Sequence, residues 1–164
     1  MEKIEGLEYN YVISNANAYL NKKNYYAAYC EVYYYYPHSE YYRNKQQEKI
    51  ASICATWKKA SGAPLGMIDY SVNSSNKLCI GFINLTNKPI VAFKFSFTPR
   101  DVFGDTLYYW SSNIANCYAD DINLTGYDTG TWYWDMDKYN GRLKTLGNFK
   151  ITQVVFADGT TWKP

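Results

Sequence analysis

The sequence predicts an α+β protein, with helices in its N-terminal part and an antiparallel β-sandwich after them. Two changes in composition carry this prediction. All six glutamates lie between Glu2 and Glu48, whereas all nine aspartates lie between Asp69 and Asp158. All seven phenylalanines, and ten of the eleven threonines, follow residue 62. Because glutamate favours helices while threonine and phenylalanine favour strands, the chain should change from helical to β structure near that residue.

The boundary is expected at SGAPLG (61–66), where two glycines and a proline interrupt regular structure. The predicted domains are therefore a helical hairpin with a third helix at 1–62 and a β-sandwich at 67–164. With 164 residues, the chain is long enough to bury a sizeable core.

Charge and hydropathy exclude several partners. The formal net charge is only +2, so no general attraction to nucleic acid is expected. No apolar run approaches the roughly 18 residues of a membrane span, and the first residues lack the apolar region of a signal peptide. A cytoplasmic protein without a membrane span is expected, or an extracytoplasmic one if the chain is a fragment of an anchored protein.

Apolar residues at helical spacing predict three helices within 1–62. The face of the first is Tyr9, Val12, Ile13, Ala16, Tyr19 and Leu20. The face of the second, which Pro37 should end, is Tyr25, Ala28, Tyr29, Val32, Tyr33 and Tyr36. Ser39 is the expected N-cap of the third, whose face is Tyr42, Gln46, Ile50, Ile53, Cys54 and Trp57.

Nine of the eighteen residues at 25–42 are tyrosines, and the periodicity places most of them on packed helix faces. Tyr34 and Tyr35 lie off that stripe and are predicted to contact a protein partner. A nucleic-acid stacking platform would need a basic groove beside the rings, which Lys22 and Lys23 alone do not make.

The segment ANAYLNKKNYYAA (16–28) resembles a tetratricopeptide helical hairpin. It has the small residues Ala16 and Ala28, the aromatic Tyr19 and the turn before Tyr25 at the spacing of that repeat. The resemblance covers about one repeat. It implies a hairpin that either binds proteins or serves as a scaffold.

Several short segments with the composition and spacing of strands predict the sandwich. They are KLCIGFINL (77–85), IVAFKFSF (90–97), TLYYW (106–110), TWYWDM (131–136) and NFKITQVVFADGTTW (148–162). Within the last of these, Ile151 and Val154 are out of phase, which predicts a bulge near Gln153. Asp158 and Gly159 predict a two-residue hairpin turn of type I′.

Two long segments resemble immunoglobulin-like domains of unknown function from bacterial, mainly Gram-positive, and phage proteins. They are LCIGFINLTNKPIVAFKFSFTPRDVFGD (78–105) and GYDTGTWYWDMDKYNGRLKTLGNFKITQVVFADGTTW (126–162). The resemblance implies an immunoglobulin-like sandwich without enzymatic activity. The Cys-Trp-Cys core pattern of true immunoglobulin domains is missing.

No group of residues predicts catalysis. The chain has one histidine, His38, and Cys30 lies too far along a helix to pair with it. In DMDKYNG (135–141), Tyr139 occupies the third ligand position of a calcium loop. We therefore expect no enzyme, no catalytic residues, no cofactor and no metal. The four cysteines are expected to be reduced, with a Cys79–Cys117 bridge as the alternative.

The expected working surface lies in GYDTGTWYWDMDKYNGR (126–142). On a strand, Trp132 and Trp134 share one face, and the larger apolar rings should face the core. Tyr133 would then be exposed. Tyr127, Tyr139 and Arg142 in the flanking loops would complete a set typical of a protein-binding hot spot. Alternatively, the tyrosines only cover the open end of the sandwich.

These observations predict a non-catalytic protein-binding module or adaptor, whose partner is a protein. A homo-oligomer remains an alternative. Two other functions stay open. One is a phage-encoded inhibitor of a bacterial defence enzyme. The other is a glycan-binding module that uses Trp132 and Trp134.

Overall fold

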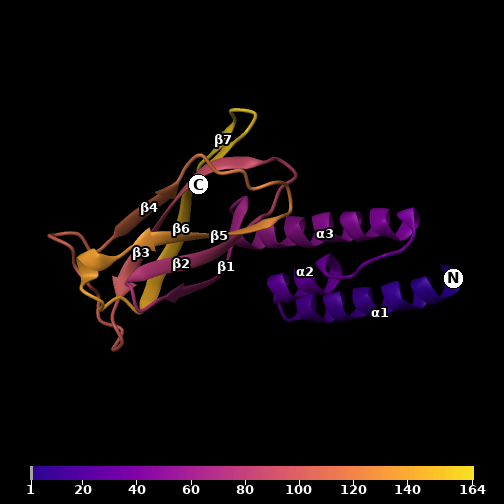
Figure 1. Ribbon diagram of the computed structural model, residues 1–164, viewed down its shortest axis with the longest axis horizontal. Coiled ribbons are helices and arrows are strands. Elements are labelled where there is room, and N and C mark those ends of the chain that lie inside the picture. The colour runs from indigo at the N-terminus through magenta and orange to yellow at the C-terminus, as the bar shows by residue number, and fades with distance from the viewer. Residues whose placement is uncertain (1) are drawn as a thin grey trace. The chain divides into compact units, whose positions relative to one another are not determined.

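A computed structural model describes residues 2–164 of the chain (Figure 1). It forms two compact units, Met1–Ser61 and Gly62–Pro164, named here the helical unit and the β unit. In the described residues, three α-helices are followed by two antiparallel sheets, which confirms the α+β class.

The helical unit contains α1 (Glu2–Asn21), α2 (Tyr25–Tyr33) and α3 (Glu40–Ser61). The turn expected between the first two helices is present, and Asn24 Oδ1 caps α2 by accepting from the Ala27 N–H at 3.2 Å. The Ser39 hydroxyl accepts from the Tyr42 N–H at 3.4 Å, as expected of the N-cap of α3. The buried apolar residues are Tyr9, Ala16, Ala28, Tyr29, Val32, Ile50, Ile53 and Cys54, all from the predicted faces.

The end of α2 differs from the prediction. The helix stops at Tyr33 rather than at Pro37, and Tyr36 is 79% exposed instead of packed. At this point Gln46 on α3 contacts the chain: its Nε2 donates to the carbonyl oxygens of Val32 at 2.7 Å, of Tyr33 at 3.4 Å and of Tyr35. These bonds satisfy carbonyl groups that the end of a helix leaves unpaired.

A buried carboxylate, which the sequence did not indicate, joins α1 to the start of α3. Glu5 Oε1 accepts from the backbone N–H of Ser39 at 2.9 Å and of His38 at 2.7 Å. The hydrogen bond from Ser39 is the main cause that lowers the pKa of Glu5 below its ordinary value of 4.5.

We expect Glu5→Gln to lower the melting temperature of the helices at neutral pH, because the amide oxygen is a weaker acceptor than the carboxylate. A lowered pKa stabilises the fold fully above the ordinary value of 4.5, and this stabilisation is lost as the pH falls through the folded-state pKa. Far-UV circular dichroism melts should therefore show a difference from wild type at neutral pH that disappears in acid. Glu8→Gln, at an exposed position of α1, is the control. A difference that persists unchanged in acid would contradict the prediction.

The β unit contains two sheets. Sheet A has the order β1 (Leu65–Val72), β2 (Lys77–Asn84), β5 (Thr129–Asp135). Sheet B has the order β4 (Ala115–Ala119), β3 (Ile90–Arg100), β6 (Thr145–Phe156), β7 (Thr161–Trp162). A 3-10 helix, η1 (Asp137–Tyr139), follows β5.

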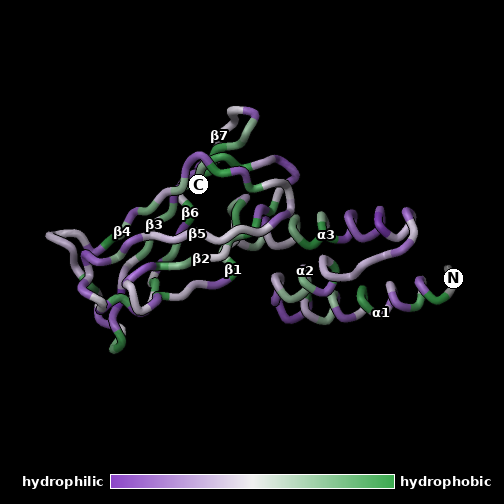
Figure 2. Tube along the Cα trace, viewed as in Figure 1, coloured by the Kyte–Doolittle hydropathy of each residue, from purple (hydrophilic) through white to green (hydrophobic). Residues whose placement is uncertain are grey.

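The two sheets pack face to face on one aromatic core. Phe82 of sheet A has its ring centroid 4.8 Å from Phe93 and 5.8 Å from Phe95 of sheet B. Trp134 also packs on Phe95, at 4.8 Å, so the tryptophan face of β5 is the core face, as predicted. Figure 2 shows hydrophobic stretches within both sheets, where alternate residues enter this core.

Asn84 is a fully buried polar residue at the end of β2, with 0% exposure. Its Nδ2 donates to the carbonyl oxygens of Lys88 at 2.8 Å, and of Leu124 and Thr125 at 3.1 Å each. Its Oδ1 accepts from the N–H and the hydroxyl of Thr86, at 3.0 Å and 2.8 Å. One amide therefore holds the end of β2, the following turn and the segment before β5 together.

The bulge in β6 is confirmed, and it lies at Thr152. The register passes from Lys94 opposite Gln153 to Phe95 opposite Ile151, so Thr152 is the extra residue. This shift lets Ile151 and Val154 both enter the core.

The hairpin after β6 is not the predicted two-residue type I′ turn. The Phe156 N–H donates to the Thr160 carbonyl at 2.9 Å, which leaves a three-residue loop. Of Asp158 and Gly159, only Gly159 has a positive φ, of 81°, whereas a type I′ turn needs both.

The other strands also differ from the prediction. Segment 106–110 is not a strand, because it makes only isolated bridges, from Thr106 to Arg100 and from Tyr109 to Ser112. The strands β1 and β4 were not predicted from the sequence. In addition, β1 begins at Leu65, inside the segment that was expected to be a break.

Candidate functional site

The structure separates the predicted site residues into several places. Tyr34 and Tyr35 lie in the helical unit, where Tyr34 is 61% exposed. Tyr35 is half-buried, with its ring 6.0 Å from that of Tyr9 and its hydroxyl 3.5 Å from the Glu5 carbonyl oxygen. Part of its ring is thus already used in packing. Of the two, Tyr34 is the one whose side chain is open to a partner.

The other four residues belong to the β unit. Tyr133 is 62% exposed and points outward from β5, opposite Cys79 on β2. A hydrogen bond with the Cys79 thiol raises the pKa of Tyr133. Tyr127 is half-buried and precedes β5, whereas Arg142 follows η1 at the other end of this strand. The sequence had suggested that Tyr127 and Arg142 lie in one cluster. The structure places them at opposite ends of β5 instead.

The prediction that Tyr139 is exposed is wrong. Its side chain is only 5% exposed and belongs to the core of the β unit. The backbone turns through η1, with the Tyr139 N–H donating to the Met136 carbonyl at 2.9 Å, and this turn directs the ring inward. Burial raises the pKa of Tyr139, which agrees with a place in the core.

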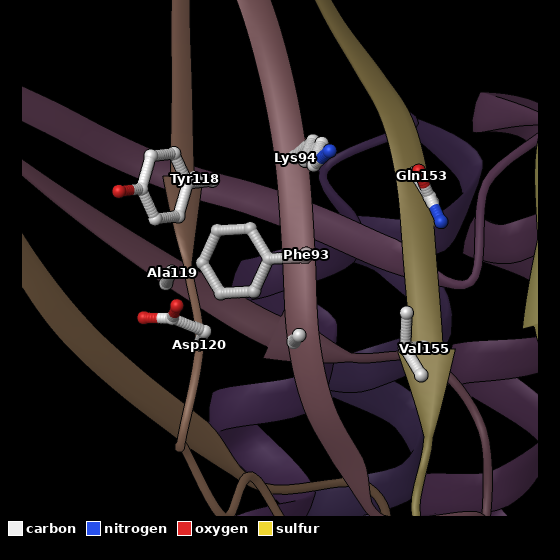
Figure 3. A pocket seen from close by; sticks show the side chains of 8 residues that line it. Phe93, Lys94, Tyr118, Ala119, Asp120, Gln153 and Val155 are labelled. Carbon is white, nitrogen blue, oxygen red and sulfur yellow. The ribbon is translucent and has the colours of Figure 1, made fainter. Parts of the chain in front are cut away.

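The surface of the β unit has several hollows, of which three share lining residues. The first, of about 280 Å³, lies on the outer face of sheet B. Figure 3 shows its side chains: Tyr118 of β4 and Gln153 of β6 stand on either side of Lys94 on β3, and Asp120 follows β4. No hydrogen bond between these four side chains occurs in the described residues.

The second hollow, of about 370 Å³, lies between β4 and β5, and Tyr118, Tyr133, Asp135 and Lys138 line it. These strands are the end strands of sheets B and A. The Trp134 indole N–H donates to the Tyr118 carbonyl at 2.7 Å and so holds the two sheet edges together. Along β4, Ala115 and Cys117 are buried, whereas Asn116 and Tyr118 face outward.

The third hollow, of about 250 Å³, lies beside η1 and is named here the η1 hollow. Its lining is Thr106, Leu107, Tyr108, Lys138, Tyr139, Asn140 and Arg142. Tyr118 lines both the first and second hollows, and Lys138 lines both the second and third. The three hollows thus adjoin, and together they are named the edge band.

Two cations are fixed within the edge band. Lys138 Nζ lies 5.5 Å from the ring centroid of Tyr109 and 5.4 Å from that of Tyr139. Arg142 Nη2 lies 3.2 Å from Asp101 Oδ2. Burial acts to raise the pKa of Asp101, but hydrogen bonds from the N–H groups of Asp105 and Phe103, together with Arg142, outweigh it and hold that pKa below its usual value.

Sequence reasoning missed the exposed aromatic residues of loop 101–114. Phe103 and Trp110 are each 87% exposed, and Tyr108 and Tyr109 are also exposed. Segment 106–110 was interpreted as a strand, which would have buried alternate rings. The missed signal is that TLYYW does not alternate in hydrophobicity.

The described residues include no cluster of three metal-binding side chains, and His38 lies in the link between α2 and α3. All four cysteines are free thiols, and burial raises the pKa of Cys54 to about 12 and that of Cys117 to about 11. Within residues 2–164, no helix combines the length and the apolar character needed to cross a membrane.

Comparison with known proteins gives no family assignment. No family model matches the chain, and no curated protein matches it. A 1.85 Å crystal structure of a hypothetical protein from Peptoclostridium difficile 630 is similar at a TM-score of 0.45. The two chains are 10% identical, and the similarity covers 62% of this chain and 87% of that chain.

Proposed function

We propose that this protein is a non-catalytic binding module that recognises an extended segment of a partner protein along the edge band. The observation that carries the proposal is the row of three adjoining hollows joined through Tyr118 and Lys138. Exposed tyrosines beside fixed cations are the composition of binding hot spots, because rigid rings bury much area at a small entropic cost. Tyr118 and Tyr133, each 62% exposed, are the central contacts.

A protein segment fits this surface better than a glycan does. Glycan binding through Trp132 and Trp134 would need a free ring face, but both rings pack on the core. Trp132 lies 5.4 Å from Phe93, and Trp134 lies 4.8 Å from Phe95. Peptide side chains, by contrast, can enter the separate small hollows of about 280, 370 and 250 Å³.

We also propose a specific fold type for each of the two units. The two antiparallel sheets on one aromatic core, together with the sequence resemblance, support an immunoglobulin-like sandwich of the kind found in Gram-positive bacterial and phage proteins. The pairing of α1 with α2, with Ala16 and Ala28 fully buried, supports a tetratricopeptide-like hairpin.

The test compares partner capture by the wild type and by the double variant Tyr118→Ala/Tyr133→Ala. Both side chains are exposed, so the melting temperature should change little. Quantitative mass spectrometry should find proteins that the wild type captures and the double variant loses.

The matched control is Tyr11→Ala/Tyr36→Ala, at helical-unit positions that are 70% and 79% exposed. It should retain the same proteins as the wild type. Equal capture by all three forms would contradict the proposal. Loss with Tyr34→Ala alone would place the binding site on the helical unit instead.

A further inference from the structure

We infer that the η1 hollow receives a carboxylate, so that the bound segment carries an aspartate or glutamate at this end of the edge band. The inference rests on the proposed function and adds to it the chemistry and the direction of the partner segment.

The charge of the η1 hollow distinguishes it from its two neighbours. Its lining contains Lys138 and Arg142 and no acidic residue. The first hollow, in contrast, has Lys94 with Asp120, and the second has Lys138 with Asp135. Because Asp101 already offsets the charge of Arg142, the uncompensated positive charge at this end of the edge band is that of Lys138, and it complements a single negative group.

Both cations have donors left for a ligand. Lys138 makes no ion pair within residues 2–164, and its contacts with the rings of Tyr109 and Tyr139 hold the ammonium group in place without an acceptor oxygen. Arg142 uses Nη2 for Asp101, and its side chain is 64% exposed. The guanidinium has five N–H donors, so this one contact leaves others free for a carboxylate.

The position of Arg142 is fixed by a built support. Asp101 Oδ1 accepts from the N–H groups of Phe103 and Asp105, at 3.0 Å each, while its Oδ2 contacts Arg142. The carboxylate of Asp101 is therefore held by the backbone and in turn directs the guanidinium. Such fixed donors lose little entropy when a ligand binds.

Polar groups complete the η1 hollow on its other sides. Thr106, Tyr108 and Asn140 line it, and each can donate a hydrogen bond from its side chain. No hydrogen bond to these three side chains occurs in the described residues.

A nucleic acid fits the edge band less well than a peptide with one acidic residue. A phosphate backbone would continue from the η1 hollow into the next two hollows, where Asp135 and Asp120 offset the charge of the lysines and leave no net positive charge to bind it. A peptide that is acidic at one end and uncharged along the rest avoids this repulsion.

The experiment uses the full chain labelled with ¹⁵N and a blocked synthetic peptide in which one glutamate is flanked by valines and threonines. The same peptide with glutamine in place of glutamate is the neutral probe. The glutamate peptide should cause saturable amide shifts at Tyr108, Lys138 and Arg142. It should bind about tenfold more tightly than the glutamine peptide, as for a charge-assisted pair.

Variants that remove a positive charge test whether Lys138 and Arg142 bind the carboxylate of the peptide. Lys138→Gln and Arg142→Gln should each reduce the preference for the glutamate peptide, and the double variant should abolish it. The control is Lys150→Gln, at an exposed position of β6, which should leave the preference unchanged.

Three outcomes would overturn the inference. The first is equal affinity for the two peptides, or no saturable shift in the η1 hollow. The second is a preference for glutamate that survives the double variant. The third is an oligothymidylate that binds the η1 hollow more tightly than the glutamate peptide. None of these three outcomes decides the proposed function. That function is tested separately, by whether the Tyr118→Ala/Tyr133→Ala variant loses the partners that the wild type captures.

Discussion

Replacing Asn84 with alanine is expected to destabilise the β unit by about 3–5 kcal/mol, because several buried polar groups lose their partner at once. The change removes the Nδ2 donor from three carbonyl oxygens and the Oδ1 acceptor from the N–H and hydroxyl of Thr86. Asn84 has no solvent exposure, so water cannot replace these bonds without opening the fold.

Denaturant unfolding followed by tryptophan fluorescence measures this change. Four of the five tryptophans lie in the β unit, and only Trp57 lies in the helical unit, so the fluorescence signal mainly reports unfolding of the β unit. Asn123→Ala, at an exposed position, is the control and should change the free energy of unfolding by less than about 0.5 kcal/mol. Asn84→Asp keeps an acceptor but loses the Nδ2 donors, so it should also destabilise strongly. A loss below about 1 kcal/mol for Asn84→Ala would show that its hydrogen bonds are not needed.

Tyr139→Ala should destabilise the β unit by about 3 kcal/mol, as for other large buried aromatic residues. Tyr133→Ala should cost less than about 0.5 kcal/mol, because that side chain is 62% exposed. The contrast follows from η1, which turns Tyr139 into the core while Tyr133 stays on the outer side of β5.

The same unfolding measurement tests this pair of variants. Tyr139→Phe keeps the ring and removes only the hydroxyl, so it should retain most of the stability that Tyr139→Ala loses. If Tyr139→Ala were thermally silent, Tyr139 would be a surface residue, as its place in the sequence first suggested.

Patterns within one element were predictable from the sequence. The helical spacing from Tyr9 to Leu20 and the alternation of Phe93, Phe95 and Phe97 each depend on one local geometry, and the structure has both. The phase change in β6 likewise indicated its bulge to within one residue of Thr152. A residue's place in the period decides its burial in these cases.

Contacts between distant residues were not predictable. Gln46 is fourteen residues from Val32, yet its side chain donates to the carbonyl groups at the end of α2. Asn84 is forty residues from Leu124, and no local pattern indicates that their segments meet. In both cases a polar side chain satisfies backbone groups of another segment, and this depends on the tertiary fold rather than on local preference.

The candidate site was predicted only in part, for the same reason. Tyr133 and Arg142 were identified from a local cluster of aromatic residues, and both lie on the edge band. Tyr118 and Lys138, which join its hollows, were missed, because the strand that carries Tyr118 has a weak sequence signal. Only the packing of the two sheets, with the hydrogen bond from Trp134 to Tyr118, shows that β4 and β5 are neighbours.

The burial of Asn84 also limits how this protein can be produced. Asn84, Leu85 and Thr86 form an N-linked glycosylation sequon, as do Asn73 to Ser75 and Asn123 to Thr125. Asn73 and Asn123 are exposed and could carry a glycan on the folded surface. A glycan on Asn84 would replace a hydrogen of the same Nδ2 that donates to three carbonyl groups, at a site with no exposed surface. Any chain that receives a glycan at Asn84 before folding in a eukaryotic secretory pathway would therefore be unable to close the β unit, whereas expression in the bacterial cytosol avoids the modification.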